Sequence, residues 1–223
     1  MTPKEGSTMK LYGPAMSQNV FRPLLAAYHC GVPVELVEVA MREGEHKSPA
    51  FRSINPFGRI PALQDGDVRL FESVAIAQYI ASRADTPAWP KNDDAERARI
   101  TAWQVWSAAH LAKAVGMVQF ERLMKGMFGG GASDEARVAE GLRLFDTETG
   151  VLDEVLGDGR QWLLGGDHPT LADLDVGGWF LHADAAGLTL KPHLSTWFES
   201  VKALPAWGQA MAHVQMPAMA RAA

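Results

Sequence analysis

A serine directly ahead of a predicted helix is the first candidate for chemistry. The stretch GPAMSQNVFRP, residues 13–23, follows a short apolar run and places Ser17 before a segment with helical spacing. Because proline fits only the first turn of a helix, Pro23 predicts a helix start near Asn19 or Val20, with Asn19 as the cap. Ser17 then lies in the preceding loop, where its hydroxyl can donate to an anion beside the helix dipole. No neighbouring base activates it, so a donor role is favoured over nucleophilic attack.

Two polar pairs further along the chain are of the types that bind charged ends of a small molecule. Glu72 and Ser73 stand where a strand ends and a helix begins, so N–H groups, a hydroxyl and a carboxylate suit the α-amino-acid end of a peptide. Plain helix capping explains this pair too, and for the pair in isolation it is the favoured interpretation. His46 and Lys47 suit a second carboxylate, although a solvated loop is the simpler explanation for them alone.

The elements that position these residues follow the order strand, helix, strand, short helix, strand, strand, helix. An Asp-Gly turn predicts a hairpin between the third and fourth strands. Pro61 at the start of the third strand indicates either an edge strand or a cis bond that leaves neighbouring backbone groups free for a ligand. The order resembles the thioredoxin-like plan, which favours the cis bond. The strands are expected at 9–13, 34–40, 59–64 and 67–71, and the main helices at 19–30 and 72–83.

Beyond a proline-containing linker at 84–94 the pattern becomes helical. The predicted fold is therefore α/β plus all-α, with an N-terminal thioredoxin-like domain at 9–84 and a C-terminal helical-bundle domain at 94–223. Helical patterns are expected at 95–127, 133–156, 170–187, 191–203 and 206–220.

Composition narrows the function classes. The chain has 223 residues, 47% hydrophobic and 21% charged, with a net charge of −5 and scattered basic residues, which argues against a nucleic-acid partner. Its single cysteine, Cys30, excludes an intrachain disulfide and is typical of a reducing compartment, so a cytoplasmic location is expected. No apolar run has membrane-spanning length, and no metal site is expected.

These motifs together resemble the cytosolic glutathione transferases of the serine type, most closely the phi class and its bacterial relatives. The matching stretches are Ser17 to Arg22, EGEHKSPAF at 43–51, NPFGRIPAL at 55–63 and DGDVRLFESVAIAQYIA at 65–81; in the helical half, TLADLDV at 170–176 resembles the family's capping box. The phi pattern often has HPAS where this chain has PAMS, which puts Met16 next to the serine and leaves Asn19 as the alternative donor.

The resemblance implies a role for each candidate. Ser17 would donate to the glutathione sulfur, and the remaining glutathione contacts would come from His46, Lys47, Arg59, the Ile60 backbone, Glu72 and Ser73. Glutathione would be a co-substrate and no cofactor is implied. The implied activity is conjugation to small hydrophobic electrophiles in detoxification; the alternatives are a glutathione-dependent peroxidase or isomerase, or a non-catalytic binding protein. In relatives the aromatic residue of NPFG, here Phe57, inserts into a partner subunit, so a homodimer is expected.

The electrophile is expected to bind in an apolar cleft against the long helix. Four side chains spaced to share one helical face are the candidates, and core packing is the alternative for each: Trp106, His110, Met117 and Phe120.

Overall fold

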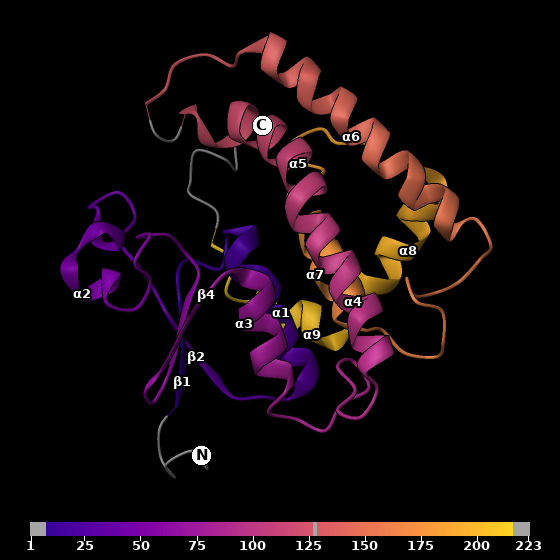
Figure 1. Ribbon diagram of the computed structural model, residues 1–223. Coiled ribbons are helices and arrows are strands. Elements are labelled where there is room, and N and C mark those ends of the chain that lie inside the picture. The colour runs from indigo at the N-terminus through magenta and orange to yellow at the C-terminus, as the bar shows by residue number, and fades with distance from the viewer. Residues whose placement is uncertain (1–7, 127–128, 216–223) are drawn as a thin grey trace. The chain divides into compact units, whose positions relative to one another are not determined.

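The computed structural model describes residues 8–126 and 129–215 as two compact units (Figure 1). The first unit contains residues 8–92 together with 204–215, and the second contains 93–203. The last helix, α9 (Pro205–Met211), therefore groups with the first unit, whereas the sequence placed it in the helical domain. It packs on the first helix, where the Phe21 and Trp207 rings lie 4.9 Å apart. Residues 216–220 of the predicted last helix lie outside the described residues.

The first unit is built on a four-stranded mixed sheet with strand order β2-β1-β3-β4. β2 runs parallel to β1, and β3 runs antiparallel to both β1 and β4, which confirms the thioredoxin-like prediction. The strands are β1 (Met9–Tyr12), β2 (Val34–Val37), β3 (Ala62–Asp65) and β4 (Val68–Phe71), and the helices are α1 (Gln18–Cys30), the 3-10 turn η1 (Glu45–Lys47), α2 (Pro49–Arg52) and α3 (Ser73–Ala81).

Helices cover both faces of this sheet. α1 and α3 pack side by side on one face (Figure 1), above the paired and fully buried Leu11 and Leu63. Because strand side chains alternate, Tyr12 points to the opposite face, where its ring meets Phe51 of α2 edge-on. Each buried leucine stabilises the fold by about 1.5–3 kcal/mol, so this two-sided core holds the strand ends rigidly in place.

The second unit is helical, as the sequence predicts. One continuous helical run contains α4 (Asp94–Trp106), α5 (Ala112–Gln119) and two π-helical turns, η2 (Ser107–Leu111) and η3 (Phe120–Met124). It lies along α6 (Glu135–Leu156) in Figure 1, and Gly141 permits this contact, since a Cβ there would lie 2.8 Å from Val118 Cγ2. The remaining helices of this unit are α7 (Leu171–Gly178) and α8 (Pro192–Lys202).

A buried carboxylate holds the centre of the second unit. Thr170 and Asp173 form the predicted capping box at the start of α7. Asp173 also accepts from the Leu163 N–H at 2.7 Å and from Trp197 Nε1 at 2.9 Å. One fully buried side chain therefore ties the loop before α7, the α7 N-terminus and α8 together. Within the described part of the chain, no helix combines the length and apolar character needed to cross a membrane.

Candidate functional site

Three chain segments meet at one edge of the sheet in the first unit. The strand register places Tyr12, Ala62 and Phe71 in one row across β1, β3 and β4. Because β3 is antiparallel to its neighbours, the loop after β1, the residues before β3 and the residues after β4 all lie beyond that row. The segments carrying Ser17, Ile60 and the Glu72–Ser73 pair are thereby brought together, although they are far apart in sequence.

Gly13 sets how closely the first two segments approach. Its φ of +132° is unfavourable for other residues, and a Cβ there would lie 2.7 Å from Val20 Cγ2 and 3.1 Å from Ile60 Cβ. The backbone after β1 thus passes directly against Ile60, which is possible only without a side chain at residue 13.

The helix after this loop begins one residue after Ser17, so the helix start inferred from Pro23 is wrong. The Ser17 carbonyl accepts from both the Val20 and Phe21 N–H groups at 2.8 Å, which makes Ser17 the N-cap by backbone geometry. Pro23 stands inside the helix and is buried there. Burial of the α1 face outweighs the single helical hydrogen bond that a proline removes.

The Ser17 side chain nevertheless does no capping. Among the described helices whose N-cap is Ser, Thr or Asp, α1 alone lacks a hydrogen bond from the helix N–H groups to the cap side chain. Ser48, for comparison, accepts from the Phe51 N–H. A half-buried hydroxyl at a helix N-terminus is therefore left uncommitted at the edge where the three segments meet.

Glu72 is held in a strained conformation at the start of α3. Its φ of 69° is the sole positive value outside glycine among the described residues. Such strain persists where the surrounding structure enforces it, and it is common at ligand sites. The Glu72 carboxylate makes no capping hydrogen bond, so plain capping does not describe it. Ser73 follows as the first residue of α3 and is buried.

The Ile60–Pro61 bond is cis, as the element order predicted. β3 is an interior strand, and Pro61 lies just before it, which excludes the edge-strand alternative. The Ile60 side chain packs against the cluster of Val39, Phe51 and Ala62. Ile60 itself lies outside the strand ladder, so its backbone is anchored by its side chain and not by a neighbouring strand.

Of the three basic candidates, Arg59 stands on the loop that leads into this bond, whereas His46 and Lys47 lie in η1. Lys47 Nζ donates to the Gly58 carbonyl at 2.8 Å, which ties η1 to that loop. His46 Nδ1 is buried and has no hydrogen-bond partner among the described atoms. Arg59 is exposed. These groups make this part of the edge suited to an anion.

Sequence reasoning gave no role to Asn55, which holds the same loop. Asn55 is buried; its amide nitrogen donates to the Arg59 carbonyl at 2.6 Å, and its amide oxygen accepts from the Phe57 N–H at 3.1 Å. The available signal was the Asn-Pro turn at the start of NPFG, because asparagine commonly bonds to backbone two residues on.

Comparison with known proteins shows to which family this chain belongs. A family model described as the glutathione S-transferase N-terminal domain matches residues 7–82. A glutathione S-transferase of Hyoscyamus muticus is 36% identical over 219 residues, covering 93% of this chain and 99% of that protein. Glutathione S-transferase 3 of Zea mays is 34% identical over 223 residues, covering 94% and 96%. This chain belongs to the glutathione S-transferase family.

Solved structures of the glutathione S-transferase family agree with this assignment. Glutathione S-transferase I from maize, in complex with an atrazine glutathione conjugate, has a TM-score of 0.79 at 31% identity, covering 93% of this chain and 98% of that one. A glutathione S-transferase I bound with lactoylglutathione has a TM-score of 0.83 at 32% identity, covering 93% and 100%. The resemblance inferred from the sequence motifs is confirmed.

The four electrophile candidates of this glutathione S-transferase do not share one environment. Trp106 Nε1 donates to Glu148 of α6 at 3.0 Å, and a Cβ at Gly141 would lie 3.0 Å from Met117 Cβ, so both contact α6. His110 and Phe120 are exposed and lie within the π-helical turns η2 and η3. These turns use i→i+5 hydrogen bonds and shift the regular helical period on which the one-face expectation rested.

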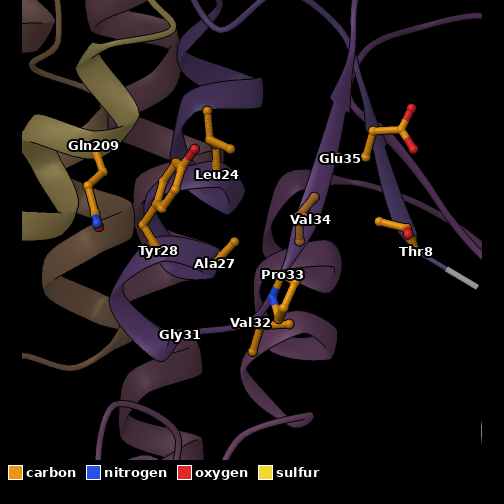
Figure 2. Close-up of a pocket in the computed structure, with 10 residues that line it drawn as sticks. All are labelled: Thr8, Leu24, Ala27, Tyr28, Gly31, Val32, Pro33, Val34, Glu35 and Gln209. Atoms are coloured by element: carbon orange, nitrogen blue, oxygen red, sulfur yellow. The ribbon is translucent and has the colours of Figure 1, made fainter. Parts of the chain in front are cut away.

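One cavity in the first unit lies at the other end of α1 from Ser17. It has a volume of about 390 Å³ and opens between the end of α1 and β2, with Leu24, Tyr28 and Val34 among its lining residues (Figure 2). None of the predicted glutathione residues lines it. Cys30 stands near that end, and burial raises the pKa of its thiol to about 11, so it is no competing nucleophile. The described residues contain no cluster of three or more metal-ligating side chains.

Proposed function

We propose that this protein is a glutathione transferase that conjugates the glutathione thiolate to small hydrophobic electrophiles. The observation that supports it most directly is the uncommitted Ser17 hydroxyl at the N-terminus of α1, at the same edge of the sheet as Ile60. A free thiol has a pKa of about 8.5, so only a few per cent is thiolate at neutral pH. A shift of about two units requires about 2.7 kcal/mol. One hydroxyl hydrogen bond to a charged group supplies roughly 1.5–3 kcal/mol, and the helix terminus adds to it.

The other contacts follow the charges of the tripeptide. Glu72 and Ser73 take the γ-glutamyl end, the Ile60 backbone pairs with the cysteinyl unit, and His46, Lys47 and Arg59 take the glycine carboxylate and its surroundings. Lys47 has three N–H donors, so the bond to Gly58 leaves others for a carboxylate. The helical unit contributes Trp106, His110, Met117 and Phe120 to electrophile binding.

Glutathione-affinity capture followed by product analysis tests this function. The purified protein is expected to bind immobilised glutathione and to form a thioether with an aryl halide such as 1-chloro-2,4-dinitrobenzene. Reduction of cumene hydroperoxide without conjugation would establish the peroxidase alternative instead. Failure to bind glutathione would leave only a binding protein of the same fold.

A glycine substitution tests whether the loop before Pro61 shapes the glutathione site. A Cβ at Gly58 would lie 2.7 Å from the His46 carbonyl oxygen and 3.2 Å from Lys47 Cδ, and the residue has φ +57°. Gly58→Ala is expected to raise KM for glutathione about fivefold, because it displaces the His46 backbone and the Lys47 side chain.

Gly66→Ala is the matched control for that substitution. Gly66 also has φ +57°, but nothing lies within 4 Å of an added Cβ. It should therefore cost only backbone strain, about 1 kcal/mol of stability, with KM for glutathione unchanged. Equal changes in KM for the two variants would show that the clash at Gly58 does not matter.

We also propose a homodimer in the cytoplasm, which suits a protein with one cysteine. Phe57 is 62% exposed, and its ring meets that of Phe71 on the edge strand β4 edge-on, with the ring centroids 5.4 Å apart. The two rings form an apolar patch suited to a second copy.

Phe57→Ala is expected to raise the dimer dissociation constant at least tenfold, as measured by analytical ultracentrifugation. Val151→Ala removes an equally exposed residue, 59%, from the second unit and should leave the association unchanged. A monomeric wild-type protein would refute the dimer.

A further inference from the structure

We propose that Glu121 is a positioning residue for electrophile binding, because it holds the π-helical turn η3 in the shape that presents Phe120. The inference rests on the proposed transferase function. It assigns a role to a buried charge that the glutathione site does not use: the Glu121 side chain is 2% exposed although it stands one residue from the exposed Phe120.

Glu121 is tied to three separate points of the second unit. Its Oε2 accepts from Lys125 Nζ at 2.7 Å and from the Asp134 N–H at 2.9 Å, and its Oε1 pairs with Arg137 Nε at 3.2 Å. The pKa of the carboxyl lies below its usual value, first because of the Lys125 hydrogen bond and then because of the Asp134 N–H. A buried carboxylate with two cations and a backbone donor is fully satisfied, so it is rigid.

These bonds close a turn between two helices. Asp134 is the N-cap of α6, and its side chain accepts from the Ala136 and Arg137 N–H groups. In a capping box the residue three positions on returns a carboxylate to the N-cap N–H. Here that position is Arg137, and Glu121 supplies the carboxylate from the other helix instead. The start of α6 is therefore fastened directly to η3.

The next residue of η3 is fastened as well. Arg122 Nη1 donates to the Ala186 carbonyl at 2.6 Å, in the segment that follows α7. The same turn exposes a pair of large apolar side chains, Phe120 at 43% and Met124 at 39%. A π-helical turn is rare and often lies at a functional site. The bonds of Glu121 and Arg122 explain how this turn keeps its shape while apolar groups remain exposed for a ligand.

Steady-state kinetics of Glu121→Gln test the role. The amide keeps the size of the side chain but loses the charge, so both cations are released and η3 loosens. We expect KM for 1-chloro-2,4-dinitrobenzene to rise at least threefold, with KM for glutathione within twofold of wild type. Glu140→Gln breaks an exposed carboxylate pair with Arg143 in the same unit and should leave both values unchanged. An equal rise in the two KM values would reduce Glu121 to a general structural role and overturn the proposal.

A double-mutant cycle shows whether Glu121 acts through Phe120. In a Phe120→Ala background, Glu121→Gln should add less than about 1.5-fold to KM for the electrophile, because the presented side chain is gone. Additive effects would overturn the proposal. Arg137→Gln, which removes one partner with an exposed side chain, should shift KM in the same direction by less and covers the case in which Glu121→Gln fails to fold.

Hydrogen exchange separates this proposal from the proposed function. Amides of residues 119–125 should exchange at least tenfold faster in Glu121→Gln, with β1, β3 and α1 unchanged. That readout needs no substrate. An inactive wild-type protein would refute the transferase function alone, whereas unchanged exchange in 119–125 would refute the proposed positioning role of Glu121.

Discussion

Ser17→Ala is expected to lower kcat for conjugation by about 10- to 150-fold, the equivalent of a lost charge-assisted hydrogen bond of roughly 1.5–3 kcal/mol. The Kd for glutathione should stay within about twofold, since the charged ends of the tripeptide keep their partners. The pH dependence of the conjugation rate tests the mechanism. The apparent pKa of bound glutathione should move up by about one to two units, back toward the free thiol at about 8.5, so activity returns at alkaline pH.

Two further variants make this result specific. Ser82→Ala removes a hydroxyl that bonds to the Tyr79 carbonyl at the far end of α3, and it should leave kcat and the pH profile as in wild type. Asn19→Ala addresses the alternative donor; the Asn19 side-chain oxygen accepts from Arg22 Nη2 at 3.0 Å. A larger loss in Asn19→Ala than in Ser17→Ala would transfer the role of thiolate donor to Asn19.

Asp173→Ala is expected to lower the free energy of unfolding by about 3–5 kcal/mol. The carboxylate accepts four hydrogen bonds: from the Leu163 N–H, the Thr170 N–H, Thr170 Oγ1 and Trp197 Nε1. Every donor is buried, so each loses its partner with no access to water. Urea denaturation followed by tryptophan fluorescence measures the change.

Asp134→Ala gives the comparison, because the exposed side chain of that aspartate makes only local capping bonds to α6, and the substitution leaves its backbone N–H in place. Its loss should cost about 1 kcal/mol, the usual value for an N-cap. A similar cost for both substitutions would mean that the Leu163 and Trp197 contacts add nothing to the capping box.

The element order of the first unit and several glycine, proline and capping signals along the chain were readable because they are local. The hairpin turn, the stop of α1 at Gly31 and the capping box at Thr170 each depend on a few neighbouring residues. One local signal was misleading. Pro23 predicted a later helix start, but burial of the surrounding helix face outweighs the preference of proline for the first turn. The regular helical period likewise missed the two π-helical turns η2 and η3, because a simple 3.6-residue pattern does not indicate where i→i+5 hydrogen bonds replace the regular ones.

The sequence by itself determined the family, the thioredoxin-like plan of the first unit and the candidate residues for a glutathione site. Only the tertiary structure decided which of them are free to do so. Ser17 and Glu72 stand at helix starts, where capping is the default, and the structure leaves both side chains uncommitted. The reason is physical: whether a polar group is satisfied depends on what the rest of the chain brings within hydrogen-bond distance, and that is set by packing and strand register, not by local spacing.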